Sequence, residues 1–461
     1  MANYHNRYIN EFKQLNTCRK GKYHIVTFGC QMNENDSEKI SGILSEMGYS
    51  ESDDIAVSDI IVFNTCCVRK TAENKIYGRI GALKGLKKER PSIVIAVGGC
   101  MTQQDGAAEY IRKKYHQVDI VFGTNDMQKL PEMIYNKVFN RIKSVLPPSS
   151  TTDVLEHIPL KRHDSIKAYV TIAQGCSNHC SYCVVPSVRG EERSRKKDDV
   201  IEEINRLVDG GAREIMLLGQ NVNSYGVDLY GYTAFGELLY EIDRIKDLER
   251  IRFMTSHPKD LTGSLIDAMK NCKKVCEHLH LPLQAGSDRI LSLMNRKYAT
   301  SDYMDLVENI RGMIPGISIT TDIIIGFPGE TEEDFLDTLE MIRRIRFDTA
   351  YTFLYSERKG TAAALLPEKV PAEVIRHRFD RLTELQNKIS KEINELLKDT
   401  EVEILAEGFS KNTHDKYTGR TRTNKIVNFN SICDLSGKLV PVRIKKVGTW
   451  SLDGICTLDN H

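Results

Sequence analysis

The sequence has little cysteine, almost no net charge and no long apolar run. Its 12 cysteines in 461 residues fall well below the roughly 8–10% typical of a disulfide scaffold. The 64 Lys and Arg balance 63 Asp and Glu, so net charge identifies no partner. No run reaches the ~18 apolar residues that span a membrane, and the first residues lack the apolar core of a signal peptide. We therefore expect no membrane partner and a cytoplasmic location, where thiols serve metals or catalysis rather than disulfides.

The length and the apolar content of 41% predict about three domains with cores of their own. Over residues 22–140, short apolar runs alternate with amphipathic stretches. This alternation is typical of a parallel α/β sheet. The stretch 141–162 contains three prolines and a Ser/Thr cluster, and it is interpreted as the connection to the next domain.

The alternation starts again in a second α/β domain, predicted at residues 162–392. Its six strand-like runs, separated by helical patterns, indicate a partial (β/α)6 barrel whose reactive face lies at the carboxyl ends of the strands. The strands are expected at residues 168–174, 214–220, 250–256, 278–284, 318–327 and 349–356. One long amphipathic helix is expected at 372–399. Residues 395–458 contain short strands between Gly, Asn and Asp turns, which predicts a small β-barrel.

Three cysteines stand close together in GCSNHCSYC: Cys176, Cys180 and Cys183. Three thiolates hold a four-iron, four-sulfur cluster while one iron keeps no protein ligand, and such an open iron is reactive. A zinc loop completed by His179 and a group of three structural thiols are the alternatives. Zinc sites usually take four ligands from two C-x2-C pairs. No second pair follows this loop, so the spacing favours the iron–sulfur cluster.

Three further cysteines are dispersed in the sequence but alike in position. Cys30, Cys66 and Cys100 each follow an apolar run, at intervals of 36 and 34 residues. Because the carboxyl ends of parallel strands meet at one edge of a sheet, we expect these thiols to converge. A single cysteine after a strand is usually a small buried hydrophobe, but three in matching positions favour a second site. Cys67 adjoins Cys66, and spacing alone does not choose between them.

These motifs resemble a known family. The Cys176–Cys183 loop, with Tyr182 between its last two cysteines, resembles the signature of the radical S-adenosylmethionine (SAM) enzymes. The order of domains is similar to the methylthiotransferases over roughly residues 22–458. Six segments resemble the MiaB type of that family: GCQMN, NTCCVR, GGC, GCSNHCSYCVVPSVRGEERSR, LLGQNVNSYG and TDIIIGFPGET. The ribosomal-protein branch usually has GCPKN at the first cysteine and the threonylcarbamoyladenosine branch has GCKVN, and neither appears here.

The resemblance implies SAM and two [4Fe-4S] clusters as cofactors. Cys30, Cys66 and Cys100 would hold an auxiliary cluster, with the family pattern favouring Cys66 over Cys67. The three cysteines of the loop would hold the cluster that cleaves SAM. The tail resembles a TRAM domain, an RNA-binding β-barrel, and the implied partner is tRNA at its anticodon stem-loop. The other six cysteines are given no role: Cys18, Cys67, Cys272, Cys276, Cys433 and Cys456.

The implied reaction converts N6-isopentenyladenosine next to the tRNA anticodon to its 2-methylthio derivative, with SAM as radical source and methyl donor. The hydrogen on C2 of adenine is too weakly acidic for a side-chain base, so a radical carried by a cofactor is the practical route. The alternative is a sister methylthiotransferase that acts on threonylcarbamoyladenosine in tRNA or on a ribosomal protein. A third hypothesis is an RNA-binding iron–sulfur protein that carries electrons or senses iron and catalyses no reaction. The cysteine loop argues against it, since an electron carrier gains nothing from an iron without a protein ligand. The sequence identifies neither the electron donor nor the sulfur source.

Polar residues at the predicted strand ends are candidate SAM contacts, and each of them serves equally well as a strand-end cap. The candidates are Gln220, Asn221, Ser256, Gln284 and, in the turn after the fifth strand, Gly326. Directly after this turn, Thr331 followed three residues later by Asp334 predicts the start of a helix.

The tail is basic although the chain is nearly neutral. Residues 408–447 contain nine Lys and Arg against two Asp, and phosphate neutralisation dominates affinity for RNA. The candidate RNA contacts are Arg420, Arg422, Lys425, Lys445 and Lys446. A second basic patch is expected from Arg189, Arg193 and Arg195.

Overall fold

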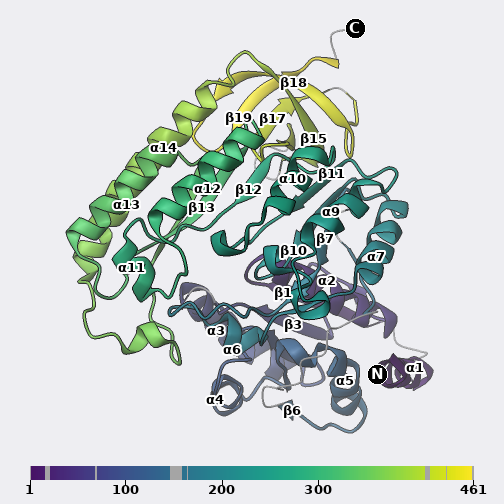
Figure 1. The fold of residues 1–461 in the computed structure, drawn as a ribbon. Coiled ribbons are helices and arrows are strands. Elements are labelled where there is room, and N and C mark those ends of the chain that lie inside the picture. Colours follow the sequence, from purple (N-terminus) through teal and green to yellow (C-terminus); the bar gives the residue numbers. More distant parts are fainter. Residues whose placement is uncertain are drawn as a thin grey trace. The chain divides into compact units, whose positions relative to one another are not determined.

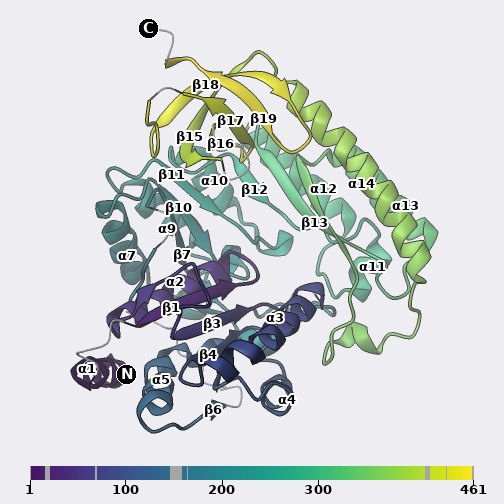
Figure 2. The same cartoon turned by 180° about the vertical axis from the view of Figure 1, so that it is seen from behind.

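The computed structural model of the chain describes seven stretches: residues 2–15, 21–67, 70–145, 158–162, 165–410, 416–431 and 433–458. Cys18 and the last two residues of NTCCVR lie outside them. The chain forms two compact units, which are described separately (Figures 1 and 2). The first is Met1–His163 with Gln174–Asn178 and Val184–Arg193, and the second is Asp164–Ala173, His179–Cys183 and Ser194–His461. No helix in the described stretches is long and apolar enough to cross a membrane.

The first unit contains a parallel sheet of six strands in the order β2-β1-β3-β4-β5-β6. The strands are β1 (Lys22–Thr27), β2 (Ser50–Glu51), β3 (Ile60–Thr65), β4 (Val94–Gly99), β5 (Ile120–Val121) and β6 (Ser144–Val145). Every residue of β3 and β4 is buried, as expected for central parallel strands covered on both faces. The predicted parallel α/β domain is confirmed, and the predicted connection contributes β6 to its edge.

Helices cover both faces of this sheet and enclose two separate apolar cores. The helices are α1 (Ala2–Leu15), α2 (Gln31–Glu46), α3 (Lys70–Glu89), α4 (Ala107–Lys114), α5 (Leu130–Phe139) and the short α6 (Val185–Arg189), with the 3₁₀ helix η1 (Thr124–Lys129). One core joins the sheet to α1, α2 and α5. The other core joins the sheet to α3 and α4. The carboxyl edge of the strands therefore lies between two helical layers.

The second unit contains six parallel strands in two three-stranded sheets, β7-β10-β11 and β12-β13-β14. The strands are β7 (Lys167–Thr171), β10 (Glu214–Leu218), β11 (Arg250–Phe253), β12 (His278–His280), β13 (Ser318–Ile325) and β14 (Thr349–Leu354). A parallel bridge pairs Ile251 of β11 with Val275, which lies three residues before β12. The predicted partial barrel is confirmed, with each strand inside its predicted run or within one residue of it.

Helices alternate with these strands. They are α7 (Lys197–Asp209), α8 (Val227–Tyr230), α9 (Phe235–Asp243), α10 (Gly263–Asn271), α11 (Asp288–Leu293), α12 (Thr300–Met313), α13 (Glu332–Ile345) and α14 (Ala372–Glu395). Shorter elements are β8 (Ala173–Gln174), β9 (Arg193–Ser194), η2 (Val222–Ser224), η3 (Pro258–Asp260) and η4 (Ala362–Leu365). Thr331 and Asp334 form a capping box at the start of α13, as predicted. The long helix α14 lies beside α13 (Figures 1 and 2).

The tail is a closed five-stranded barrel in the order β15-β16-β17-β19-β18, drawn in yellow in Figure 1. Its strands are β15 (Glu401–Phe409), β16 (Tyr417–Thr421), β17 (Ile426–Asn430), β18 (Leu439–Val447) and β19 (Leu452–Cys456). Buried Arg250 and Arg252, at the amino end of β11, donate to backbone carbonyls of the tail at 2.5 to 3.3 Å. The predicted small barrel is confirmed, and it packs within the same compact unit as the larger one.

Candidate active site

Four thiols of the first unit lie at the carboxyl edge of its sheet. Cys30 follows β1, Cys66 and Cys67 follow β3, and Cys100 follows β4. The last paired residues of β3 and β4 are Thr65 and Gly99, so the thiols that follow are neighbours. The structure thus brings the dispersed cysteines together, as expected from a parallel sheet. Their role as cluster ligands stays a prediction.

Two glycines with positive φ let the loops at this edge approach closely. Gly29 has φ +135°, and a Cβ there would lie 2.8 Å from the Cβ of Cys66. Gly99 has φ +105°, and a Cβ there would lie 2.4 Å from the carbonyl oxygen of Thr65. Such contacts leave no room for a side chain, and positive φ disfavours any residue but glycine.

Cys67 belongs to this group of thiols as much as Cys66 does. Cys66, Cys67 and Cys100 are all buried. A hydrogen bond between Cys67 and Cys100 lowers the pKa of the Cys100 thiol and raises the pKa of the Cys67 thiol. Within the described stretches, no three His, Cys, Asp or Glu side chains are placed to bind one metal ion. A four-iron cluster needs a wider arrangement, because each thiolate binds a different iron.

A buried ion pair adjoins Cys100. Arg189, at the end of α6, donates from Nη2 to Oδ2 of Asp36 at 2.7 Å and from Nε to Sγ of Cys100 at 3.2 Å. The Arg189 and Asp36 side chains are each only 5% exposed. In the second unit Arg195 is also buried and bonds to Glu203 and to a backbone carbonyl. Burial requires Arg189 and Arg195 to have internal partners, so these two do not form the predicted basic patch. Half-buried Arg193 donates to the carbonyls of Glu191 and Arg189.

The loop cysteines of the second unit lie in a tight turn fixed by backbone hydrogen bonds. The Cys183 N–H donates to the Cys180 carbonyl at 3.0 Å, and the Ser181 N–H donates to the carbonyl of Met294 at 3.0 Å. Tyr182 packs against an apolar cluster that includes Phe327. In the first unit, Sγ of Cys176 accepts a hydrogen bond from the Asn178 N–H.

Cys180 also accepts a hydrogen bond from a buried arginine. Arg296 donates from Nη1 to Sγ of Cys180 at 3.4 Å. Its other groups donate to the carbonyl of Pro282 at 3.0 Å and to the hydroxyl of Tyr298 at 3.1 Å. Both thiol sites therefore contain a buried guanidinium that points an N–H at a cysteine sulfur.

Buried polar oxygens gather at the carboxyl ends of the barrel strands. Among the described residues they have no hydrogen-bond donor: Gln220 Oε1, Asn221 Oδ1, Asn223 Oδ1, Ser256 Oγ and Gln284 Oε1. An unsatisfied buried polar group costs about 1–3 kcal/mol. Four of these five residues are the sequence-predicted SAM contacts, and Asn223 is an addition from the same LLGQNVNSYG motif. The donor-free oxygens fit a polar ligand such as SAM at this edge.

Backbone strain accompanies these side chains. Thr255 has φ +71° and Gln284 has φ +72°. A non-glycine residue in this conformation costs on the order of 1–3 kcal/mol, and such residues cluster at ligand sites. Sequence reasoning missed this signal, since neither residue type is associated with positive φ.

His257 is a further residue that sequence reasoning missed. It follows Ser256 and is buried, and its Nδ1 accepts a hydrogen bond from the Lys259 N–H at 3.3 Å. Burial, together with the charges of Arg296 and Lys259, lowers the pKa of His257 to about 2. The imidazole is therefore neutral, with Nε2 as the donor.

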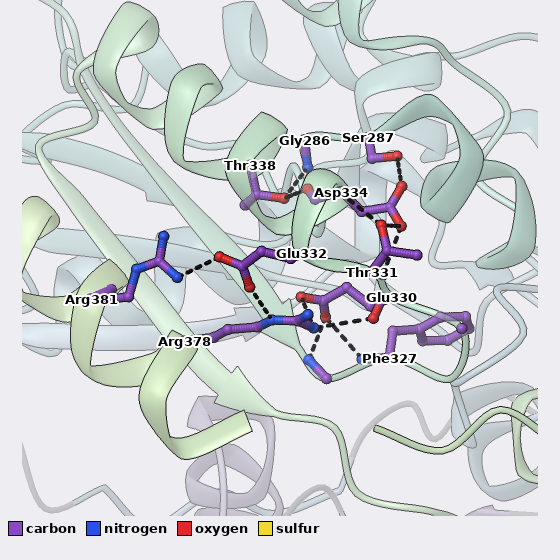
Figure 3. A network of polar contacts seen from close by, with 12 residues as sticks. Gly286, Ser287, Phe327, Glu330, Thr331, Glu332, Asp334, Thr338, Arg378 and Arg381 are labelled. Carbon is purple, nitrogen blue, oxygen red and sulfur yellow. Dashed lines mark hydrogen bonds and ion pairs between the residues drawn. The ribbon is translucent and has the colours of Figure 1, made fainter. Parts of the chain in front are cut away.

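The predicted Gly326 contact lies in a turn held by a polar network, of which Phe327, Glu330 and Arg378 are labelled in Figure 3. The N–H groups of Gly326 and Phe327 donate to the carboxylate of Glu330, which pairs with Arg378 of α14 at 3.2 Å. Gly326 has φ +74°, and a Cβ there would lie 2.4 Å from Ile375 of α14. Packing against α14 already explains the glycine, and its approach to SAM stays a prediction.

Three of the five predicted RNA contacts have partners inside the second unit, and two of them, Arg422 and Lys425, join the tail barrel to the larger barrel. Arg422 donates twice to the carboxylate of Glu277, at 2.7 Å each. Lys425 pairs with Asp348 at 2.6 Å, and both side chains are only 11% exposed. Arg420 bonds to the Asn424 side chain at 3.2 Å. These cations satisfy acidic and polar groups inside the unit.

The other two predicted contacts lie on an exposed strand. Arg443, Lys445 and Lys446 of β18 are all exposed. A register shift between Ile444 and Lys446 interrupts the alternation of the strand, which places two successive lysines on the outer surface. Arg443 belongs to this row, although the sequence-based selection did not include it.

Three family models match the chain. The radical SAM superfamily matches residues 170–342, the uncharacterized protein family UPF0004 matches residues 22–123, and the TRAM domain matches residues 398–457.

Solved structures share the fold at low sequence identity. The radical SAM methyltransferase TsrM from Kitasatospora setae, solved with tryptophan and a SAM analog, has a TM-score of 0.55 and 14% identity, covering 75% of each chain. The cobalamin-dependent radical SAM enzyme OxsB has a TM-score of 0.51 and 10% identity, covering 82% of this chain and 57% of its own.

Curated relatives match almost the whole chain. A protein of Acetivibrio thermocellus is 54% identical over 97% of this chain and 95% of its own length. A protein of Clostridium tetani is 52% identical over 95% of this chain and 96% of its own length. Both have the name tRNA-2-methylthio-N(6)-dimethylallyladenosine synthase. At this identity and coverage, the chain belongs to the family of the tRNA-2-methylthio-N(6)-dimethylallyladenosine synthases.

Proposed function

We propose that the protein converts N6-isopentenyladenosine next to the tRNA anticodon to its 2-methylthio derivative, with SAM as radical source and methyl donor. The observation that carries the proposal is the presence of two separate thiol groups, one at the sheet edge of the first unit and one in the loop that follows the first barrel strand, β7. A radical reaction that inserts sulfur needs a radical generator and a sulfur carrier. The cytoplasm, where tRNA is modified, is the proposed location.

The residues present fit both cofactors. Cys30, Cys66 and Cys100 would hold the auxiliary [4Fe-4S] cluster, and the three loop cysteines would hold the second. When bound, the two clusters and SAM supply the radical, the sulfur and the methyl group. The donor-free oxygens of Gln220 and Gln284 match the ammonium and hydroxyl donors of SAM.

The chain's own residues bind and orient SAM and shield its site. Asn221 is held by its amide donating to Asp260 at 2.7 Å, which aims its free oxygen. His257, neutral because of burial and nearby cations, offers an N–H donor without adding charge beside a cationic sulfonium. Gly286 and Ser287 bond to Thr338 and Asp334 of α13 (Figure 3). These bonds fix the segment that follows Gln284.

We further propose that the exposed row Arg443, Lys445 and Lys446 on β18 contacts the backbone of the anticodon stem-loop. Nearby Trp450 is 62% exposed, and an exposed indole offers a stacking surface for an unpaired base. Arg422 and Lys425, whose ion pairs with Glu277 and Asp348 join the tail barrel to the larger barrel, serve docking instead. The pair of Lys445 with Asp399 is exposed.

Mass spectrometry of tRNA nucleosides from cells with and without the gene tests the proposal. The 2-methylthio derivative of isopentenyladenosine should disappear in the deletion strain, and the unmethylthiolated nucleoside should accumulate. An unchanged level of this derivative, with loss of methylthio-threonylcarbamoyladenosine or of ribosomal-protein methylthiolation, would reassign the protein to a sister activity.

A further inference from the structure

Two buried arginines, one at each thiol site, donate an N–H to a cysteine sulfur, and they differ in how their charge is balanced. We propose that Arg189 and Arg296 are positioning residues that set the reduction potentials of the two clusters, the Arg189 charge being cancelled by Asp36 and the Arg296 charge not. The inference rests on the proposed function, in which Cys100 and Cys180 are cluster ligands.

The position of Arg189 is fixed both by a partner of its side chain and by a hydrogen bond to the neighbouring backbone. Asp36 lies on α2, which begins directly after Cys30, and its carboxylate accepts from Nη2 of Arg189 at 2.7 Å. The carbonyl of Val188, next to Arg189 on α6, accepts from the hydroxyl of Thr124 at 3.0 Å. The guanidinium is thus held so that Nε points at Cys100 Sγ, 3.2 Å away. Such a fixed donor keeps its direction whether the cluster is oxidised or reduced.

Arg296 is fixed as firmly but by uncharged partners. Its Nη2 donates to the carbonyl of Pro282, and its Nε donates to the hydroxyl of Tyr298. The Tyr298 hydroxyl in turn donates to the carbonyl of Leu283 at 2.8 Å. Within the described residues no carboxylate pairs with Arg296, so a full positive charge stays buried beside Cys180, 3.4 Å from Nη1. A buried cation without a carboxylate is costly and is therefore expected to serve a nearby negative group.

Both contacts act on the reduction potential of the adjacent cluster. Reduction adds an electron to the cluster, and hydrogen bonds to its sulfurs and nearby positive charge favour the more negative state. Arg189 contributes its hydrogen bond alone, because Asp36 cancels its charge. Arg296 contributes a hydrogen bond and a charge. Removing Arg296 should therefore lower the potential of its cluster more than removing the neutral Arg189–Asp36 pair as a whole lowers that of the other.

The test uses the full chain, reconstituted anaerobically with iron and sulfide, in two backgrounds. Replacing the three loop cysteines with Ala leaves the auxiliary cluster, and replacing Cys30, Cys66, Cys67 and Cys100 with Ala leaves the SAM-side cluster. Midpoint potentials are measured by potentiometric titration with electron paramagnetic resonance of the reduced cluster, and iron is counted for each variant. These readouts do not depend on turnover.

In the auxiliary background, Arg189→Gln should shift the reduction equilibrium about tenfold toward the oxidised cluster, which is about 59 mV to lower potential for one electron. Asp36→Asn should shift it in the opposite direction, because Arg189 then keeps an uncancelled charge. In the other background, Arg296→Gln should lower the potential by more than the double substitution Arg189→Gln with Asp36→Asn does in the auxiliary background, because the double substitution removes a hydrogen bond without changing the net charge. A purely structural role predicts no such opposite signs.

Shifts of the same sign for Arg189→Gln and Asp36→Asn, or no shift in either at full iron content, would overturn the inference. If the Arg189→Gln variant loses iron, the sign of the shift in midpoint potential is read from two other variants. These are Arg189→Lys, which keeps the charge, and Asp36→Asn. A parent background that binds no iron would instead refute the cysteine assignment in the proposed function, and the potential assignment would fall with it.

Discussion

At the edge of the first unit, the thiols come from positions 30 to 100, whereas the second site takes its thiols from the nine residues of GCSNHCSYC. The first set converges because β1, β3 and β4 are parallel and adjacent. The second set is brought together by chain proximity. A site built from strand ends depends on the packing of a whole sheet, whereas a local loop depends mainly on the turn that contains it.

The strongest test of this comparison separates the two sites by their products. Replacing Cys176, Cys180 and Cys183 with Ala should abolish formation of 5′-deoxyadenosine from SAM and reduce the iron content from about eight to about four per chain. Replacing Cys30, Cys66 and Cys100 should give the same loss of iron but keep 5′-deoxyadenosine formation, while sulfur insertion stops. Loss of both activities in the second variant would mean that the two roles are wrongly assigned.

At the sheet edge two adjacent thiols, Cys66 and Cys67, are candidates for one ligand position, whereas no cysteine of the loop has an adjacent cysteine. This difference sharpens the comparison of the two sites. Cys66→Ala should lose most of the auxiliary iron, whereas Cys67→Ala should keep it, as measured by iron and sulfide analysis of reconstituted protein. Loss of iron in Cys67→Ala with retention in Cys66→Ala would identify Cys67, which is hydrogen-bonded to Cys100, as the ligand instead.

The buried ion pair supports the sheet edge against unfolding. Asp36→Ala leaves Arg189 buried without its carboxylate, which should destabilise the first unit by about 3–5 kcal/mol. Urea unfolding of the iron-free chain measures this loss. Glu109→Ala removes an exposed pair with Lys113 on α4 and should cost less than about 0.5 kcal/mol. A similar cost for both substitutions would refute the structural importance of the buried pair.

Substitution of Gly326 tests how packing of its turn against α14 contributes to stability at the edge of the barrel. Gly326→Ala combines positive φ with a contact to Ile375 and should cost about 2–4 kcal/mol. Gly231 has a similar φ of +79°, but a Cβ there would meet no atom within 4 Å. Gly231→Ala should therefore cost only the backbone strain, about 1 kcal/mol. Equal thermal shifts for the two variants would show that packing against α14 contributes nothing.

The smallest expected effect is a pH dependence at the same turn. Burial, opposed by the Gly326 N–H and the Arg378 charge, raises the pKa of Glu330 from its ordinary 4.5 to about 7. The folded state then binds the proton more tightly than the unfolded state, so stability falls as pH rises from 4.5 to 7. We expect a loss of about 2 kcal/mol, which Glu330→Gln should abolish. A wild-type unfolding midpoint that stays constant over this range would contradict the raised pKa.

The sequence predicted the elements better than it predicted the environment of single side chains. The six barrel strands, the capping box at Thr331 and the closed tail barrel follow from local periodicity and turn residues, and the structure confirms them. The SAM candidates were chosen only because they follow strands, yet four of them have buried oxygens without a donor among the described residues. Arg189 and Arg195 were predicted to form a basic patch with Arg193, but both are buried.

The sequence by itself determined the spacing of the loop cysteines, the alternation that makes the parallel strands of both units, and the basic composition of the tail. Only the tertiary structure decided which charges are neutralised internally. Asp36 lies 153 residues from Arg189, and Glu277 lies 145 residues from Arg422. Local patterns show what a residue can do, but they do not show which distant partner removes it from solvent. Burial and pairing depend on contacts that form only when the sheets and the barrels are packed.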